Sequence, residues 1–341
     1  MKKYSLENKI VKLVSAQKER GILQSRIAKD LGYSRSYISE KLKSMVERGI
    51  LRREPENPFQ YRIYITENGK KKDVSFTVGL LMASEYIFAI AAIRKAARKV
   101  GVNAKFKVYK NTTRLNSDVI AGKIQVMLSP TLSQLAMSLS SDSIVMIKPI
   151  ATGGSCIIEN TSSKNNLNLS SSSSTMILMM KKLLGRSNNG EIRRMDDASK
   201  SIDLVRNGDF RRIAIWEPYA SSLLLEKKCT VIASYSDLLG EFPCCFLSAT
   251  HEFCQKGGKT ISAISNFYDQ QRENHDLCNS DVKWAISFIS LKTGIDENLV
   301  EKSLDNYNFK IHYSHEKLLS FMENIRTYMT TDQAESLLGK E

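Results

Sequence analysis

Cysteine and histidine are the residue types that most readily hold a transition-metal ion, and several of them cluster in this chain. Cys244, Cys245, His251 and Cys254 fall within eleven positions. This spacing does not match a paired C-x-x-C zinc site, and adjacent cysteines rarely chelate one tetrahedral ion. Cysteines flanked by apolar residues on a strand are more often core residues. We therefore predict no metal site and no cofactor.

Catalytic motifs are missing from the sequence as well. It contains no phosphate-binding loop, no G-x-S-x-G elbow and no plausible nucleophile–base pair. This pattern predicts that the protein is not an enzyme. The six cysteines lack the spacing of a disulfide scaffold and are expected to be reduced thiols, as is typical of a cytoplasmic protein. They are Cys156, Cys229, Cys244, Cys245, Cys254 and Cys278.

No secretion signal or membrane span is predicted. The basic start of the chain places Glu7, Lys9 and Lys12 where a signal peptide needs an apolar run. The longest apolar stretch, Val74 to Ile93, approaches membrane length but carries Glu85 near its centre. A buried strand that runs into a helix explains this stretch better, so we predict a cytoplasmic protein without membrane contact.

Charge is concentrated at the start of the chain. The whole sequence of 341 residues has a formal net charge of +14, with 42% hydrophobic residues, enough to build ordinary cores. Residues 1–72 hold 18 Lys+Arg and 8 Asp+Glu, whereas the other 269 residues hold 32 and 28. A basic segment before a nearly neutral one indicates a nucleic-acid module joined to another domain. A solvated charged face is the alternative.

Helical periodicity divides residues 5–48 into three helices. Leu6, Ile10 and Val14 recur at the spacing of an amphipathic helix that ends near Gly21. A short helix over residues 22–32 is closed by a glycine, and Ser34 or Ser36 can cap a third helix that runs to about Arg48. Two short helices joined by such a turn form a helix-turn-helix.

Two strands joined by a turn-rich connection are predicted next, over residues 49–54 and 61–66. Together with the three helices, they resemble the winged helix-turn-helix of archaeal and bacterial regulators. The resemblance covers residues 5–70 and implies that one set of side chains reads base edges and another meets phosphates of double-stranded DNA. A winged helix that makes only protein contacts is the alternative. The implied base-edge residues are Arg35, Ser36, Tyr37 and Ser39, and the implied phosphate contacts are Lys41, Lys43, Arg52, Arg53 and Arg62.

After a charged joint at residues 70–73, strands and helices alternate. Strands are predicted over 74–79, 104–109 and 124–128, with helices over 85–100 and 114–121. This alternation is typical of an α/β sheet with helices on both faces. Periodicity alone predicts no chemistry for this part of the chain.

Short motifs after residue 73 occur in the order of a known family. They are Gly79-Leu80-Leu81, then residues 121–130 ending in Ser129-Pro130, Ala151-Thr152-Gly153-Gly154-Ser155, Ser173-Ser174-Thr175, Trp216-Glu217-Pro218-Tyr219-Ala220 and Thr293-Gly294-Ile295-Asp296. Together they resemble the periplasmic-type solute-binding proteins that serve nitrate, sulfonates and thiamine-type pyrimidines. The resemblance spans about residues 74–310 and implies two lobes around a cleft. Lobe I is expected over about 74–158 and 240–341, and lobe II over about 160–238.

The resemblance also implies a set of ligand-binding residues at strand ends. The Thr152–Ser155 loop offers backbone N–H groups and two hydroxyls, and the serines before a predicted helix lie where N–H groups favour an anion or acceptor. A flexible linker is the alternative for the serine run. The implied residues are Leu81, Met82, Ser129, Thr152, Gly153, Gly154, Ser155, Ser173, Ser174, Thr175, Trp216 and Glu217.

Glu217 follows a predicted buried strand, Arg212 to Ile215. A carboxylate there can accept hydrogen bonds from a ligand N–H group. The alternative is that Glu217 caps the next helix while Trp216 packs in the core, and both can hold at once.

The stretch around Cys244 and Cys245 also resembles that of pyrimidine-synthesising enzymes of this fold. Those enzymes carry a cofactor-holding lysine and a histidine where this chain has Ser129 and Ser133. Without an amine there is no Schiff-base nucleophile, which argues against the synthase but not against a pyrimidine ligand.

The two resemblances together predict a two-domain regulator. Residues 1–72 would form the winged helix-turn-helix, and residues 73–341 the ligand-binding domain. We predict a cytoplasmic homodimer that binds an operator and responds to a small effector, with the first helix and the region 317–338 as candidate dimer contacts. The alternatives are a small-molecule binding module without DNA function and, less favoured, a pyrimidine-synthase-like enzyme. A nitrogenous heterocycle is the favoured ligand, and sulfonates and small anions stay open.

Overall fold

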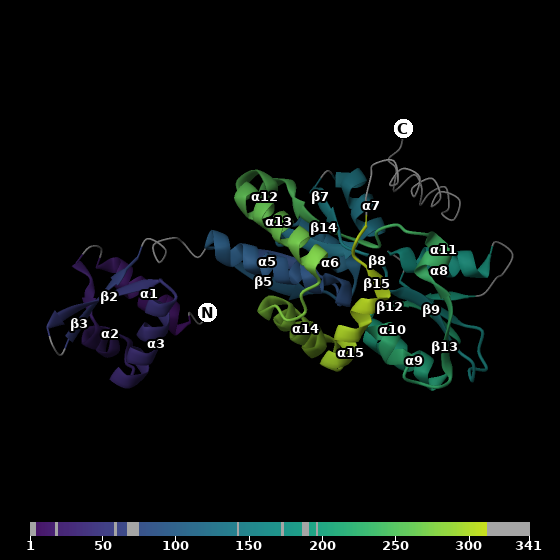
Figure 1. The fold of residues 1–341 in the computed structure, drawn as a ribbon, viewed down its shortest axis with the longest axis horizontal. Helices are drawn as coiled ribbons and strands as arrows, with labels where there is room; N and C mark the ends of the chain where they lie inside the picture. The colour runs from purple at the N-terminus through teal and green to yellow at the C-terminus, as the bar shows by residue number, and fades with distance from the viewer. Residues whose placement is uncertain are drawn as a thin grey trace. The chain divides into compact units, whose positions relative to one another are not determined.

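The structure, a computed structural model, divides the chain into two compact units, Met1–Val74 and Ser75–Glu341 (Figure 1). It describes residues 5–17, 20–57, 60–66, 75–141, 143–171, 174–185, 191–195 and 197–311. The region 317–338, predicted as a dimer contact, lies outside the described residues. Within these ranges, no helix combines the length and the apolar character needed to cross a membrane.

The described residues of the first unit form three helices and a three-stranded antiparallel sheet of order β1-β3-β2. Its apolar core includes Ile10, Ile27, Ile38 and Leu42, which come from all three helices. The elements are α1 (Leu6–Ala16), β1 (Ile22–Leu23), α2 (Gln24–Leu31), α3 (Arg35–Glu47), β2 (Leu51–Asn57) and β3 (Gln60–Ile65).

Local signals explain the turn between α2 and α3. Gly32 closes α2 in the left-handed conformation (φ 69°), and Ser34 caps α3 by accepting a hydrogen bond from the backbone N–H of Tyr37. The predicted start of the second helix at residue 22 is wrong. Ile22 and Leu23 instead pair with β3 as a short strand, and α2 begins at Gln24.

Lobe I of the second unit is built on a five-stranded sheet of order β5-β4-β6-β14-β7. Its first three strands are parallel, and β14 runs antiparallel to both β6 and β7. Because β14 follows the whole of lobe II in the sequence, the chain returns to lobe I to complete this sheet. The strands are β4 (Ser75–Leu80), β5 (Asn103–Val108), β6 (Val126–Pro130), β7 (Ile144–Pro149) and β14 (Cys245–Thr250).

Helices cover this sheet, and α5 packs against both α13 and α14. The 3₁₀ segment η2 (Ser84–Tyr86) precedes α5, where the sequence predicted an α-helix from residue 85. The helices are α5 (Ile87–Val100), α6 (Thr112–Ile120), α7 (Thr131–Ser141), α12 (His251–Lys256), α13 (Gly258–Asn274), α14 (Ser280–Thr293) and α15 (Glu297–Lys302), followed by η3 (Ser303–Asn306).

Lobe II has its own five-stranded sheet, of order β11-β10-β12-β9-β13. Its strands are β9 (Ser155–Asn160), β10 (Asn168–Ser170), β11 (Ile192–Arg194), β12 (Arg212–Trp216) and β13 (Cys229–Ser234). Its helices are α8 (Thr175–Leu184), α9 (Ala198–Asn207), α10 (Tyr219–Leu223) and α11 (Tyr235–Leu239).

The chain crosses between the lobes twice, after β7 and before β14. Strand β9 pairs with β12 and β13, so residues 155–160 belong to lobe II. The predicted end of lobe I at residue 158 is therefore several residues too late. Between the lobes, β8 (Thr152–Gly153) pairs with β15 (Tyr307–Asn308).

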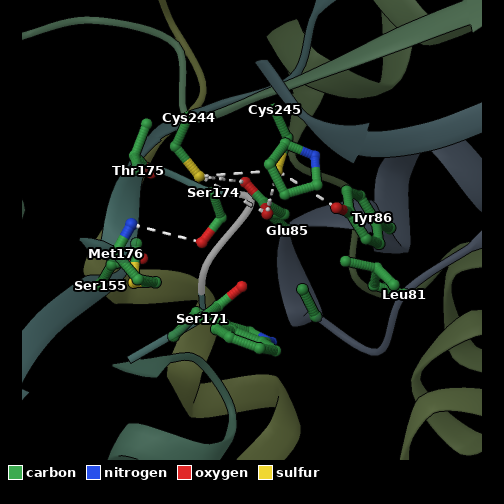
Figure 2. A pocket seen from close by; sticks show the side chains of 13 residues that line it. Leu81, Glu85, Tyr86, Ser155, Ser171, Ser174, Thr175, Met176, Cys244 and Cys245 are labelled. Atoms are coloured by element: carbon green, nitrogen blue, oxygen red, sulfur yellow. Dashed lines mark hydrogen bonds between the residues drawn. The ribbon is translucent and has the colours of Figure 1, made fainter. Parts of the chain in front are cut away.

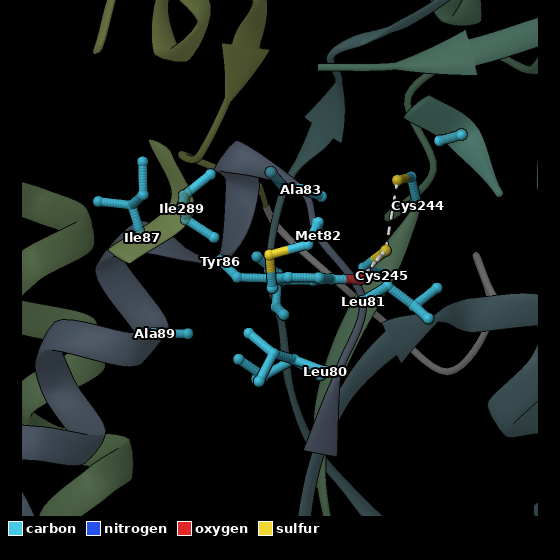
Figure 3. Packing of buried hydrophobic residues seen from close by; sticks show 14 of the residues in the cluster. Leu80, Leu81, Met82, Ala83, Tyr86, Ile87, Ala89, Cys244, Cys245 and Ile289 are labelled. Carbon is cyan, nitrogen blue, oxygen red and sulfur yellow. Dashed lines mark hydrogen bonds between the residues drawn. The ribbon is translucent and has the colours of Figure 1, made fainter. Parts of the chain in front are cut away.

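The apolar stretch 74–93 forms β4, η2 and the first half of α5. From Ile87 to Ile93 every side chain is buried, because α5 lies under α13 and α14. Figure 3 shows the core around Tyr86, whose hydroxyl reaches the sulfur of Cys245.

Candidate ligand-binding site

A cavity lies between the two lobes, and both contribute to its wall (Figure 2). It holds about 370 Å³ of space outside atoms, part of which is open to solvent. Its walls are mostly apolar with a few polar groups, as is common for small-molecule sites. Lobe I contributes Leu81, Ala83, Glu85, Tyr86, Pro130, Cys244 and Cys245, and lobe II contributes Ser155, Ser171, Ser174, Thr175, Met176 and Trp216.

Five of the predicted ligand residues line this cavity: Leu81, Ser155, Ser174, Thr175 and Trp216. Ser173 lies outside the described residues. The remaining predicted residues are not part of the lining, and each is engaged elsewhere in the second unit.

Met82 and Ser129 use their polar atoms within the protein. The Trp216 indole N–H donates to the Met82 carbonyl at 2.7 Å, which fixes the tryptophan at the cavity wall. Ser129 is fully buried, and both its carbonyl and its hydroxyl accept from the amide of Gln134. Their roles therefore differ from the predicted contact with ligand.

The Thr152-Gly153-Gly154 segment also serves the fold. Thr152 and Gly153 form β8, and the N–H of Gly154 donates to the Asn306 carbonyl at 2.8 Å. A Cβ at Gly154 would lie 1.8 Å from the Tyr307 ring, and its φ is +63°. Glycine is needed here for close packing, not for exposing N–H groups to a ligand.

Glu217 caps α10, as its alternative interpretation described. One carboxylate oxygen accepts from the backbone N–H of Ser221 at 2.9 Å, and the other accepts from the Asn306 amide at 2.7 Å. Burial raises the pKa of Glu217, while these hydrogen bonds oppose the shift. Both carboxylate oxygens of Glu217 therefore have partners within the protein, and the residue is not part of the cavity lining.

Two hydroxyls of lobe II, those of Ser174 and Ser155, line the cavity and differ in their hydrogen bonds. Ser174 caps α8 and accepts from the backbone N–H of Met176 at 3.3 Å. Ser155 is 5% exposed, and its hydroxyl has no hydrogen-bond partner among the described residues. A buried hydroxyl without a partner costs free energy, so Ser155 is available to a ligand.

Glu85 is the acidic group of the cavity, and the sequence analysis did not identify it as a site residue. It is only 2% exposed, and both cysteine thiols donate to it, Cys245 at 2.9 Å and Cys244 at 3.3 Å. Burial raises its pKa to about 7, against the effect of these two hydrogen bonds. An acidic residue inside the apolar run 74–93 was the signal that could have revealed it.

Cys244 and Cys245 stand at the start of β14, and their sulfur atoms are 3.6 Å apart. Both are buried in the core, as predicted, yet both also line the cavity. The Cys245 thiol lowers the pKa of Cys244, but burial and the nearby carboxylate outweigh it and raise that pKa to about 11. Burial raises the pKa of Cys245 well above its ordinary value. Both side chains are therefore neutral thiols at pH 7.

On the first unit, the predicted base-edge residues lie on α3. Arg35, Ser36 and Tyr37 in its first turn are exposed, and Ser39 is half-buried. Lys43 is exposed and Lys41 half-buried one turn further along. No ion pair involves Arg35 or Lys43 within the part of the chain that the structure describes.

The three arginines of the β2–β3 hairpin are engaged within the protein. Arg62 pairs with Glu56 through two hydrogen bonds of 2.6 and 2.8 Å and also donates to the Arg20 carbonyl. Arg52 pairs with Glu54, and Arg53 stacks 3.5 Å from the centre of the Tyr61 ring. The positive charge of Arg62 and Arg52 is therefore partly neutralised by neighbouring carboxylates.

The two-lobed unit is similar to solved solute-binding proteins. A ligand-binding component of an ABC-type import system from Staphylococcus aureus, solved with zinc bound, has a TM-score of 0.62 and 11% identity and covers 78% of this chain and 98% of its own. The alkanesulfonate-binding protein SsuA from Xanthomonas axonopodis pv. citri, bound to MOPS, has a TM-score of 0.60 and 14% identity, with 78% and 95% covered. The nitrate-binding protein NrtA from Synechocystis PCC 6803 has a TM-score of 0.57 and 10% identity, with 78% and 85% covered.

The second unit has a periplasmic-binding-protein-like fold. The predicted mixed α/β architecture with two lobes is thereby confirmed. No family model and no curated protein sequence matches this chain. These structural neighbours are solute-binding proteins, and none of the comparisons supports the predicted DNA-binding function of residues 1–72.

Proposed function

We propose that the periplasmic-binding-protein-like unit binds a small organic molecule in the cavity between its lobes. One observation carries this proposal: a hydroxyl from one lobe and a carboxylate from the other face the cavity, and both can form further hydrogen bonds with a ligand. Among the described residues, the hydroxyl of Ser155 in lobe II has no hydrogen-bond partner, and the Glu85 carboxylate in lobe I accepts only from two weak thiol donors. A ligand that contacts both lobes favours a closed state over an open one.

The lining favours a nitrogenous heterocycle over a small anion. No Lys, Arg or His occurs among the described residues that line the cavity, and its acidic group would repel a nitrate or a sulfonate. Leu81, Met176 and Trp216 offer an apolar wall for a flat ring, and Glu85 can accept hydrogen bonds from a ring N–H or amino group. A thiamine-type pyrimidine has this chemistry.

A thermal-shift screen tests the ligand class. The panel holds hydroxymethylpyrimidine, thiamine and its phosphates, taurine, alkylsulfonates, nitrate and sulfate. We expect a rise in Tm with an amine-bearing ring and none with the anions, because a ligand of the folded state stabilises by mass action. Glu85→Gln should abolish the rise, while the matched variant Glu217→Gln should keep it. An anion response that survives Glu85→Gln would contradict the assignment.

A second function, DNA binding by the first unit, is favoured by the α3 surface. Arg35, Tyr37 and Lys43 are exposed on one helix that follows a tight turn, and the sheet order β1-β3-β2 places a two-stranded hairpin after it. This arrangement supports a winged helix-turn-helix, with α3 in the major groove. Because the hairpin arginines are engaged internally, α3 would contribute most of the phosphate attraction.

Anisotropy with genomic DNA fragments tests this function on the full chain. The double variant Arg35→Glu/Lys43→Glu should weaken binding by on the order of 100-fold and flatten the salt dependence of the affinity. The control, Lys292→Glu, reverses an exposed charge on α14 of the second unit. DNA affinity that is equal in the double variant and the control would overturn the α3 assignment.

Joined, the two functions would make the protein a cytoplasmic, ligand-responsive regulator that acts as a homodimer. The ligand would then change DNA affinity by the difference between its affinities for the two states of the protein. Operator affinity measured with and without the ligand found by the screen tests the coupling. If the affinity is unchanged, the unit between residues 75 and 341 is a binding module without regulatory function.

A further inference from the structure

Three potential metal ligands meet at one edge of the cavity. Glu85, Cys244 and Cys245 each offer a ligand atom, and these atoms all lie within 4.8 Å of one another. All three side chains are buried, and they come from two segments that are about 160 residues apart in the sequence. We propose that this group binds a thiophilic divalent cation of the zinc class.

The spacing of the two sulfur atoms matches a shared ion. They lie 3.6 Å apart, while two thiolates on a tetrahedral zinc, each with a Zn–S distance of about 2.3 Å, are separated by roughly 3.8 Å. Oε1 of Glu85 lies 3.7 Å from the Cys244 sulfur and 2.9 Å from the Cys245 sulfur. To bind the same ion, Oε1 of Glu85 has to move away from the Cys245 sulfur by only a fraction of an ångström.

In the sequence, adjacent cysteines argued against a metal because they rarely chelate one tetrahedral ion. On a regular strand, two neighbours would also point to opposite faces. The structure removes this objection. Strand β14 begins at Cys245, and Cys244 precedes it, with its N–H donating to the Ala151 carbonyl at the crossing between the lobes. The alternation of a regular strand therefore does not apply to this pair, and both sulfurs turn toward Glu85 (Figure 2).

The buried carboxyl group of Glu85 has no cationic partner among the described residues. Buried carboxylates in proteins are normally paired with a cation or coordinate a metal. No Lys or Arg forms an ion pair with Glu85 in the described ranges, and its only hydrogen bonds there come from weak thiol donors. Close by, the hydroxyl of Tyr235 is fully buried and has no hydrogen-bond partner among the described residues. Among the described residues, the cluster therefore lacks a cation, and the hydroxyl of the neighbouring Tyr235 lacks a hydrogen-bond partner.

The ligand set selects the class of ion. Two thiolates and one carboxylate suit zinc and similar thiophilic ions, whereas calcium and magnesium require shells of oxygen ligands. Binding would release the two thiol protons to solvent, and the sulfur atoms would bind as thiolates. Three protein ligands leave a further position on a tetrahedral ion open.

Cobalt titration of the full chain tests the proposal, with the metal alone as the probe. Co²⁺ is added anaerobically to protein freed of metal, and thiolate-to-cobalt charge-transfer absorption is recorded. We expect saturation at one equivalent and loss of the band in the double variant Cys244→Ser/Cys245→Ser. The controls Cys254→Ser and Cys278→Ser, which change thiols outside the cluster, should retain it. No band in the wild type, or an unchanged band in the double variant, overturns the proposal.

A second measurement covers the case in which the double variant fails to fold. Glu85→Gln keeps the size and shape of the side chain, and it should weaken Zn²⁺ binding by at least about 10-fold, since even outer-shell changes cost 10–100-fold. An equal Zn²⁺-induced rise in Tm in the wild type and Glu85→Gln counts against the site. Because no organic ligand is present, failure here leaves the ligand screen and its outcome unaffected.

Discussion

The α3 surface and the inter-lobe cavity are built in opposite ways. The candidate residues on α3 lie between Arg35 and Lys43, on one helix, and all are exposed except Ser39 and Lys41, which are half-buried. The cavity takes residues from separate segments between Leu81 and Cys245, and its acidic group is 2% exposed. The exposed residues of α3 contribute little to packing, whereas the buried residues of the cavity also contribute to the packing of the lobes. Substitutions on α3 should therefore change DNA binding with little effect on stability, whereas substitutions at the cavity should change both ligand binding and stability.

The largest effect on stability is expected where the lobes cross. Gly154→Ala should destabilise the second unit by about 3 to 5 kcal/mol, because the new Cβ meets the Tyr307 ring in a backbone conformation that alanine rarely adopts. Gly122→Ala is the matched control: it has a similar φ of +69° and nothing within 4 Å. Urea unfolding followed by tryptophan fluorescence, with both tryptophans in the second unit, measures the difference. If Gly154→Ala and Gly122→Ala lose equal free energy of unfolding, the loss comes from backbone strain at positive φ and not from the contact with Tyr307.

Two buried glutamates of the same unit should respond in opposite directions to the same substitution. Glu217→Gln should destabilise by about 1 to 3 kcal/mol, because an amide NH₂ would face one of two donors, Ser221 N–H or the Asn306 amide. Glu85→Gln should stabilise metal-free protein by about 1 to 3 kcal/mol at pH 8, since it removes a buried carboxyl that has no cationic partner among the described residues. Unfolding in the presence of a chelator measures both. A loss of stability in Glu85→Gln would indicate a structural role for Glu85.

An acid-dependent contribution is expected from Asp281, which anchors α14 to α5. Burial raises the pKa of Asp281, but the hydrogen bonds from Arg98 and the charges of Arg98 and Arg94 outweigh it and hold the pKa below its usual value. Stability from this group is therefore present above the unfolded-state pKa and is lost as pH falls through the lower folded-state pKa. Asp281→Asn should destabilise at pH 7 by roughly 1 to 2 kcal/mol. The difference should shrink as pH falls below about 3.9, the ordinary pKa of Asp, and the two proteins should converge only below the lower folded-state pKa, as measured by unfolding at a series of pH values.

The smallest effect on stability is expected on α3. Arg35→Glu should change the free energy of unfolding of the first unit by less than about 0.5 kcal/mol, because the side chain is exposed and forms no ion pair within the described residues. Circular dichroism on the full chain measures this change while DNA anisotropy measures function. If Arg35→Glu unfolds the first unit, the proposed separation of stability from binding on α3 is wrong.

The sequence predicted most of the elements and missed the centre of the cavity. Local rules were sufficient for the cap at Ser34, the left-handed turn at Gly32 and the alternation of strands and helices. They misplaced the start of α2, because only pairing with β3 makes Ile22 and Leu23 a strand. They also assigned Glu217 a possible ligand contact and passed over Glu85, although both are buried carboxylates in the same unit.

By itself, the sequence determined the features that depend on neighbours along the chain: periodicity, caps, the basic first unit and the motif order of a two-lobed fold. The tertiary structure decided which polar groups find partners. Asn306 satisfies Glu217 from 89 positions away, while Glu85 meets Cys244 and Cys245 about 160 positions away and no cation among the described residues. Burial and hydrogen-bond partners depend on contacts between distant segments, and these contacts set the free energy of each polar group.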